Sequence, residues 1–145
     1  MIKTSYYAKT KEVVEMGFVP IAISLCEPKW WCYPVCRGLA PSENILRCYQ
    51  NGQYSEKDYE THYIDLLKRR YGDSREIAPN RIKDDILKSI HVDLRERGEI
   101  AIPKPKDDIK VCLMCYESPE KFCHRKLLHG ILNCDELKFD KYEEE

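Results

Sequence analysis

The sequence lacks an excess of charge of either sign, because 24 Lys and Arg residues nearly balance 25 Asp and Glu residues and leave a net charge of −1. Such a balance gives no general attraction to nucleic acids or membranes, although it is compatible with a local basic face. The sequence also lacks an apolar run long enough to cross a bilayer, and it has no internal repeat or low-complexity block. An ordinary globular protein is therefore the expected class, and one domain is the default for 145 residues.

Features of export are missing as well, since residues 1–9 contain no apolar signal segment. We therefore expect a cytoplasmic location, where the compartment is reducing and the eight cysteines are not structural disulfides. Three uses of these thiols remain open, namely packing in the core, a metal site and a functional thiol. We expect packing for most of them.

The most informative stretch is residues 111–132, which reads as a buried strand, a polar turn and an amphipathic helix. Residues 111–116 form a continuous apolar run, typical of a strand covered on both faces. Ser118 and Pro119 end this run, and apolar residues then recur at helical spacing. In α/β folds, ligands bind beyond the carboxyl ends of strands and next to helix N-termini. The residues at that place are Glu117, Cys123, His124 and Arg125.

The rest of the chain predicts strands that alternate with helices. We expect strands at residues 2–7 and 18–25, a short helix at residues 11–16 between them, and two long helices at residues 55–71 and 80–97. Ser55 and Asp58 resemble a capping box, and Asn80 is the expected cap of the second long helix. This alternation predicts a single α/β domain over residues 1–134, with a small, mostly parallel sheet flanked by helices. Residues 103–108 read as a polar linker, and residues 135–145 as a charged, flexible tail.

Residues 27–41 are a long irregular segment rich in proline, which excludes a regular helix. Trp30 and Trp31 favour order there, because their large apolar area tends to be buried. Two interpretations remain open. The segment is either a loop pinned to the core by its aromatic residues, or a loop folded over the site with Trp30 and Trp31 as a wall for a ligand. The second interpretation predicts that at least one of these rings lies close to residues 123–125.

Cys123 is the candidate nucleophile. A reactive cysteine needs its thiolate form, which helix N-termini, His and Arg favour, and His124 and Arg125 are its neighbours in sequence. The start of the helix decides how strongly the dipole acts on Cys123. A start at Phe122 places Cys123 at the positive end, whereas a start capped by Ser118 places it in the second turn. Both starts remain open.

Glu117 is the candidate base or orienting group, and Arg125 has two compatible roles. Its planar fork suits a carboxylate or a phosphate, so Arg125 would clamp an anionic ligand. It would also form an ion pair with Glu117 that ties the strand to the helix. The expected ligand-binding residues are Cys115, Tyr116, Trp30 and Trp31.

A metal site is the other sharp hypothesis, with zinc as the expected ion and Cys32 and Cys36 as the candidate ligands. Cys112 and Cys115 are not expected to chelate together, since residues three apart on a strand face opposite sides. Cys115 and Cys123 are a candidate redox pair, as both would lie near the end of the strand. Further ligands that could join the loop cysteines are Cys26, Cys123 and His124.

Residues 113–117, LMCYE, followed by Cys123, His124 and Arg125, resemble the C-terminal signature of the uncharacterised family known as domain of unknown function 488. The tyrosine-rich helix around residues 59–63 is similar to a subset of that family. So are upstream positions, namely Ile23, Ser24, Pro28, Trp30, Leu39, Ala40 and Pro41. The resemblance implies a small cytoplasmic α/β domain and no particular activity. The chain departs from the family at residues 25 and 26, which are apolar here where an Arg or an acidic residue is expected.

These observations predict an enzyme, or a binder, of a small anionic ligand such as a nucleotide or a nucleic-acid component. Glu117, Cys123, His124 and Arg125 would carry the chemistry. The alternative is a non-enzymatic binding module that zinc stabilises, with its aromatic residues presented to a partner. Neither hypothesis involves a membrane.

Overall fold

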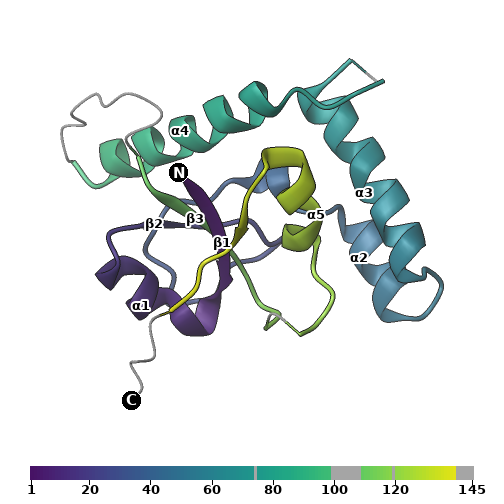
Figure 1. The fold of residues 1–145 in the computed structure, drawn as a ribbon, viewed down its shortest axis with the longest axis horizontal. Coiled ribbons are helices and arrows are strands. Elements are labelled where there is room, and N and C mark those ends of the chain that lie inside the picture. The colour runs from purple at the N-terminus through teal and green to yellow at the C-terminus, as the bar shows by residue number, and fades with distance from the viewer. Residues whose placement is uncertain (74, 99–108, 119, 140–145) are drawn as a thin grey trace.

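The structure is a computed structural model that describes residues 1–73, 75–98, 109–118 and 120–139. Its centre is a parallel sheet of four strands in the order β2-β3-β1-β4 (Figure 1). The strands are β1 (Ile2–Tyr6), β2 (Val19–Ala22), β3 (Val111–Cys115) and β4 (Asp135–Glu136). The prediction of an α/β fold with a parallel sheet is confirmed, and its strands β2 and β3 are parallel neighbours.

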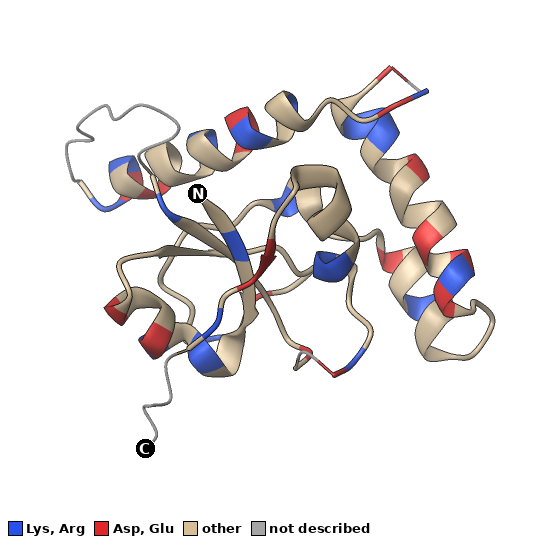
Figure 2. Ribbon diagram, in the orientation of Figure 1, with Lys and Arg blue, Asp and Glu red and all other residues tan. Residues whose placement is uncertain are grey.

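The described residues form five α-helices around this sheet: α1 (Thr10–Glu15), α2 (Glu43–Gln50), α3 (Glu56–Tyr71), α4 (Pro79–Glu96) and α5 (His124–Leu132). Short 3₁₀ turns lie at Tyr7–Lys9 and Arg37–Leu39. Acidic and basic residues are interspersed along α3 and α4, as expected for helices with one solvated face (Figure 2). None of the described helices is long and apolar enough to span a membrane.

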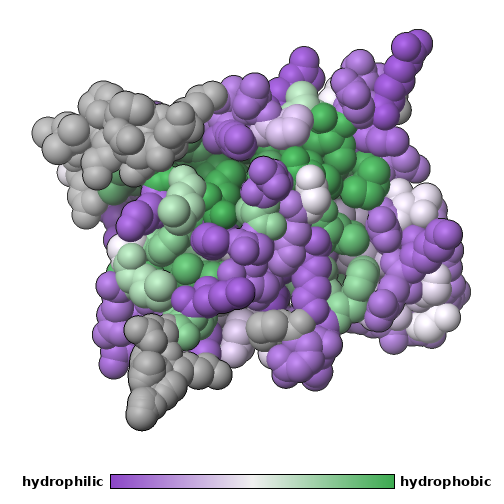
Figure 3. All heavy atoms as spheres, viewed as in Figure 1, coloured by the Kyte–Doolittle hydropathy of each residue, from purple (hydrophilic) through white to green (hydrophobic). Residues whose placement is uncertain are grey.

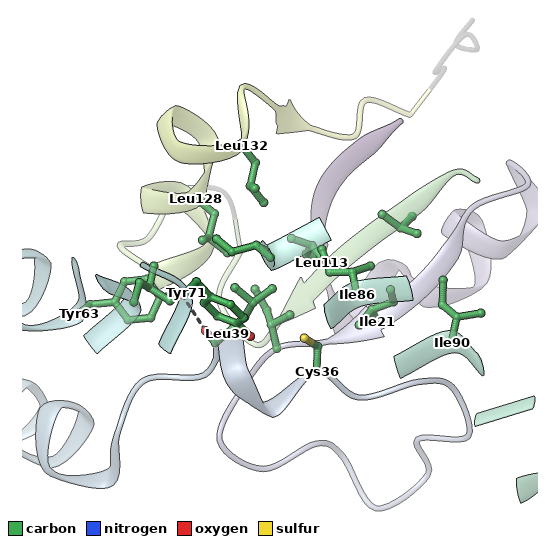
Figure 4. Packing of buried hydrophobic residues seen from close by; sticks show 14 of the residues in the cluster. Ile21, Cys36, Leu39, Tyr63, Tyr71, Ile86, Ile90, Leu113, Leu128 and Leu132 are labelled. Carbon is green, nitrogen blue, oxygen red and sulfur yellow. Dashed lines mark hydrogen bonds between the residues drawn. The ribbon is translucent and has the colours of Figure 1, made fainter. Parts of the chain in front are cut away.

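Two apolar layers cover the two faces of the sheet. On one face, Ile21 of β2 and Leu113 of β3 pack against residues of α3, α4 and α5, such as Ile86 and Leu128 (Figure 4). In the same layer Tyr63 donates a hydrogen bond of 2.6 Å to the backbone oxygen of Leu39. On the other face, α1 and the loop after β2 cover a smaller cluster: Tyr7, Val13, Phe18, Ala22, Cys112, Met114 and Leu137, with Trp31 packed against it.

The helix boundaries follow local chemistry, with some departures from the sequence predictions. The capping box at Ser55 is present, with Asp58 as its second member. Helix α4 begins with Pro79 rather than after an Asn80 cap, which suits proline because the first helical position needs no N–H donor. Helix α2 was not predicted. Its N-cap is Ser42, which accepts a hydrogen bond from the Ile45 backbone N–H.

The end of the described chain belongs to the domain, which corrects the prediction of a flexible tail from residue 135. Strand β4 pairs in parallel with β1, and Lys3 forms a 2.6 Å ion pair with Asp135. Leu137 is buried against the sheet, and its N–H bonds to the Thr4 backbone oxygen. The predicted linker at residues 103–108, and residues 140–145 of the predicted tail, lie outside the described residues.

A groove at the amino ends of β1 and β3 is lined in part by Ile86, Leu87 and Leu132, and apolar surface gathers between α4 and α5 in this view (Figure 3). Cysteines are not among the described residues that line this groove. The predicted site residues lie at the opposite, carboxyl end of the sheet.

Candidate active site

A cleft of about 640 Å³ lies at the carboxyl ends of β2 and β3. It is bounded by the turn before α5 and by α2 and α3, so it occupies the place where parallel sheets commonly bind ligands. The cleft contains most of the predicted site residues. They are Cys115, Tyr116, Glu117, Cys123 and His124.

Cys123 is the N-cap residue of α5, with extended backbone angles (φ −155°, ψ 149°). Helix α5 therefore begins at His124, two residues after Phe122, the later of the two predicted starts, and Ser118 does not cap it. As the cap, Cys123 lies at the positive end of the helix dipole, where a thiolate is stabilised. Its side chain is buried at the floor of the cleft.

The sulfur atoms of Cys115 and Cys123 meet, and the structure pairs them as a disulfide. Their Cα atoms are 7.7 Å apart, which exceeds the range of roughly 4.4–6.8 Å that disulfides span. A carboxylate oxygen of Glu117 joins them, and the three ligand atoms lie within 4.8 Å of one another. The sequence prediction that Cys115 and Cys123 approach each other near the strand end is confirmed.

His124 is buried beside this group, and its two ring nitrogens have different partners. Nε2 lies 2.7 Å from the backbone oxygen of Ile23. Because a carbonyl can only accept, Nε2 carries the proton, and Nδ1 presents its lone pair to the Cys123 sulfur at 3.6 Å. Burial lowers the pKa of His124 to about 4, against the opposing effect of the Ile23 hydrogen bond. The imidazole is thus neutral near pH 7, and in the reduced protein its Nδ1 can accept a hydrogen bond from the Cys123 thiol.

Arg125 does not act as a clamp for an external anion, which corrects that prediction. Its side chain is fully buried, and its guanidinium is bonded to Glu136 at 2.8 and 3.1 Å and to the backbone oxygen of Glu117 at 2.5 Å. The expected ion pair with the Glu117 side chain is replaced by the Glu136 pair. Arg125 also donates to the Cys115 sulfur, so it stabilises negative charge on that thiol from inside the protein.

Glu136 is a functional neighbour that sequence reasoning missed. It accepts hydrogen bonds from Arg125 and Thr4, and His129 lies 3.4 Å from the same carboxylate. Burial alone would raise the pKa of Glu136, but the Arg125 and Thr4 hydrogen bonds outweigh it and hold the pKa below its usual value. Burial lowers the pKa of His129. A strand of two residues carries no periodic pattern that could have placed Glu136 here.

One wall of the cleft is aromatic. Tyr49, Tyr59 and Phe122 form a cluster with ring centroids 5.1–5.4 Å apart, and Tyr116 lines the cleft near the cysteines. The charged residues that line the cleft are mostly acidic, with one lysine among them: Glu56, Glu117, Glu120 and Lys121. The cleft therefore offers flat apolar contact and a negative field.

Trp30 and Trp31 are not among the described residues that line the cleft. They pack around Tyr7, at centroid distances of 6.5 and 5.0 Å, and Tyr7 in turn contacts Tyr116 at 4.7 Å. Trp31 belongs to the apolar layer on the α1 face of the sheet. The loop thus supports the cleft through Tyr7 and Tyr116, and the prediction that the tryptophans form its wall is wrong.

The predicted metal ligands Cys32 and Cys36 differ in their exposure to solvent. Cys32 is exposed, while Cys36 is buried with its sulfur 3.5 Å from Asp85. Asp85 also accepts a hydrogen bond from Tyr71. Among the described residues, the group that could hold a metal is the one formed by Cys115, Glu117 and Cys123, so the loop cysteines are not supported as ligands.

Comparisons of the chain with protein-family models, curated proteins and solved structures give no match. The resemblance to domain of unknown function 488 stays a prediction. The assignment of the site depends on the geometry of this chain's own residues.

Proposed function

We propose that the protein is an enzyme in which the Cys123 thiolate adds to an electrophilic ring carbon of a planar ligand bound in the cleft, with a nucleobase or nucleoside as the expected class. The ring double bond opens as the S–C bond forms, and the neighbouring ring atom takes up a proton from solvent, so no leaving group is needed. The observation that carries this proposal is the position of Cys123, which caps α5 and lies at the floor of a cleft of ligand size. A thiol held at a helix N-terminus beside a carboxylate and a neutral imidazole has the elements of an activated nucleophile.

The neighbours of Cys123 have different roles in activating its thiol. The α5 N-terminus favours the thiolate, and His124 Nδ1 fixes the direction of the sulfur. With a pKa of about 4, the buried His124 is a weak base, whereas the exposed Glu117 carboxylate lies within 4.8 Å of the Cys123 sulfur and can pass a proton on to solvent. Glu117 therefore has the role of base, and His124 that of a positioning residue.

The lining of the cleft supports a nucleic-acid component without a phosphate rather than a nucleotide. Tyr49 and Phe122, which are half-buried at the cleft, offer flat faces on which a base can stack, a contact worth about 1–3 kcal/mol per base. The three carboxylates that line the cleft outnumber its single lysine, so their combined charge repels a phosphate. Arg125 is paired with Glu136 inside the protein and is not available to a ligand. A neutral or cationic ring fits these charges better than an anion.

The test is the rate at which iodoacetamide modifies each cysteine in reduced, metal-free protein at pH 7, mapped by peptide mass spectrometry. We expect Cys123 to react about tenfold faster than the exposed Cys32, because the helix terminus stabilises its thiolate. A saturating nucleoside should slow modification of Cys123 and leave Cys32 unchanged. A Cys123 that reacts only in denaturant would contradict the proposal and favour the non-enzymatic binding module.

Two variants separate a catalytic thiol from a packing residue. Cys123→Ser should abolish covalent modification in the cleft while the protein still binds the nucleoside in calorimetry, and Cys32→Ser is its matched control. If Cys123→Ser instead lowers the free energy of unfolding by about 1–3 kcal/mol, the thiol is a packing residue and the reaction is excluded.

A further inference from the structure

We propose that Cys115, Glu117 and Cys123 form a binding site for Zn²⁺, with an open coordination position that faces the cleft. The donors are two sulfur atoms and one carboxylate oxygen, and all three lie within 4.8 Å of one another. Cys115 ends β3, Glu117 follows it on the same turn, and Cys123 caps α5, so the donors come from both sides of one strand-to-helix connection.

The spacing of the two cysteines suits a shared metal better than a direct bond. Their Cα atoms are 7.7 Å apart, beyond the disulfide range of roughly 4.4–6.8 Å. A tetrahedral zinc ion with bonds of about 2.3 Å to sulfur holds its donor atoms about 3.8 Å apart. Donors that already lie within 4.8 Å of one another need only small side-chain rotations to reach that arrangement.

The charges around the group fit a divalent ion. Two thiolates and a carboxylate would place three negative charges at the edge of the sheet, and Zn²⁺ offsets two of them. The Arg125 guanidinium, which donates to the Cys115 sulfur, compensates on the inner side. A hydrogen-bond donor to a ligating thiolate is the kind of outer contact that tunes structural and catalytic metal sites.

The donor atoms select zinc over the common hard cations. Thiolates are soft ligands that favour Zn²⁺, whereas Mg²⁺ and Ca²⁺ prefer oxygen ligands throughout. Three protein ligands with a free fourth position are the arrangement of catalytic rather than structural zinc sites. The fourth position lies on the side of the cleft, since all three donors line it.

The site exists only when both cysteines are reduced, because a disulfide leaves the sulfurs without the charge that a metal needs. Binding converts each thiol to a metal-bound thiolate and releases its proton to solvent. The metal site does not depend on the proposed reaction of Cys123. The two are linked in one way: bound Zn²⁺ occupies the Cys123 sulfur and blocks its attack on a ligand.

Reduced full-length protein, stripped with a chelator and titrated with Zn²⁺ or Co²⁺, tests the site. We expect one ion per chain, with Co²⁺ giving the absorption bands of tetrahedral thiolate coordination. Cys115→Ser and Cys123→Ser should each weaken Zn²⁺ binding by at least about a hundredfold, and Glu117→Gln by about tenfold. The matched controls are Cys32→Ser and Glu120→Gln, which should bind as the parent protein does.

A second measurement needs no variant, so it holds even if a substitution impairs folding. Zn²⁺ should protect Cys115 and Cys123 of the parent protein from iodoacetamide and leave Cys32 reactive. No uptake of metal by the reduced chain, or uptake that protects other cysteines, would overturn the metal site. A slow Cys123 in metal-free protein would instead overturn the proposed reaction, so the two failures are distinguishable.

Discussion

Two thiol clusters of similar composition have different relations to solvent. The open cluster (Cys115, Glu117, Cys123 and His124) lines the cleft, while the closed cluster (Cys36, Tyr71 and Asp85) lies under α4. Each joins cysteine to a carboxylate. Cys36 is 1% exposed, and its burial raises the pKa of its thiol to about 11, with the nearby Asp85 charge adding to the effect.

The comparison shows that access and the direction of hydrogen bonds decide what a thiol can do. In the closed cluster, Tyr71 and Cys36 both point their hydrogens at Asp85, and a side chain at Gly38 would collide with the Tyr71 hydroxyl. The Cys36 sulfur itself is buried, and it does not line the pocket that Gly38 and Asp85 border. In the open cluster, a neutral imidazole and a helix terminus face Cys123, and the cleft leaves one side free.

The largest expected effect comes from removing the internal support of the open cluster. Arg125→Met should lower the free energy of unfolding by about 3–5 kcal/mol, because the half-buried Glu136 carboxylate then loses the guanidinium that neutralises its charge and keeps only Thr4 and His129 as neighbours. Urea unfolding followed by circular dichroism measures it. Arg47→Met is the control, since Arg47 pairs with Glu43 on the exposed face of α2 and should cost less than about 1 kcal/mol. Equal losses in the two variants would show that Arg125 has no special role.

A smaller loss of stability is expected when a hydrogen bond of the closed cluster is removed. Tyr71→Phe removes the hydroxyl that donates to Asp85 and leaves this carboxylate short of a donor, so we expect a loss of about 1–3 kcal/mol. The cleft should be untouched, and the alkylation rate of Cys123 should stay as in the parent. Tyr54→Phe is the control, because Tyr54 stacks on His62 away from both clusters. A change in the alkylation rate of Cys123 in Tyr71→Phe would show that the two clusters are coupled.

The smallest effect concerns pH and the Arg125–Glu136 pair. The pKa of Glu136 is lower in the folded protein than in the unfolded chain. At a pH between these two pKa values the unfolded chain therefore binds more protons, and the pair stabilises the fold at higher pH. Stability should therefore be lost as the pH falls below about 4.5, the ordinary carboxyl range. Glu136→Gln should flatten this part of the profile of melting temperature against pH, whereas Glu43→Gln should not. An unchanged slope in Glu136→Gln would mean that other groups set the acid limit.

The parts of the fold that could be predicted from the sequence are those with strong local signals. The apolar run that became β3 and the capping box at Ser55 needed no tertiary information. Helix α2 was missed because it has only 8 residues and directly follows the irregular segment at residues 27–41. Its amphipathic pattern and its cap at Ser42 were the available signals.

The grouping of Glu117, Cys123 and His124 followed from their place after a buried strand, but their roles did not. The start of α5 depends on the backbone angles of Cys123, which the sequence leaves undetermined. The partner of Arg125 could not be found, because Glu136 reaches it through a two-residue strand paired with β1. The misplacement of Trp30 and Trp31 has a similar cause, since an irregular loop gives no sign of which face it covers.

The strand order also fixes when the site can form during synthesis. Ile2 of β1 pairs with Val111 of β3, and β4 follows later still, so the first strand leaves the ribosome long before either neighbour exists. Helices α2, α3 and α4 emerge before the sheet that they cover, a topology of distant contacts that folds slowly. Cys115, Glu117 and Cys123 lie close together in the sequence, but the cleft that they line also includes residues of α2 and α3 and of the loop after β2. A nascent chain therefore cannot complete the cleft until β3 has been made and has paired with β1 and β2.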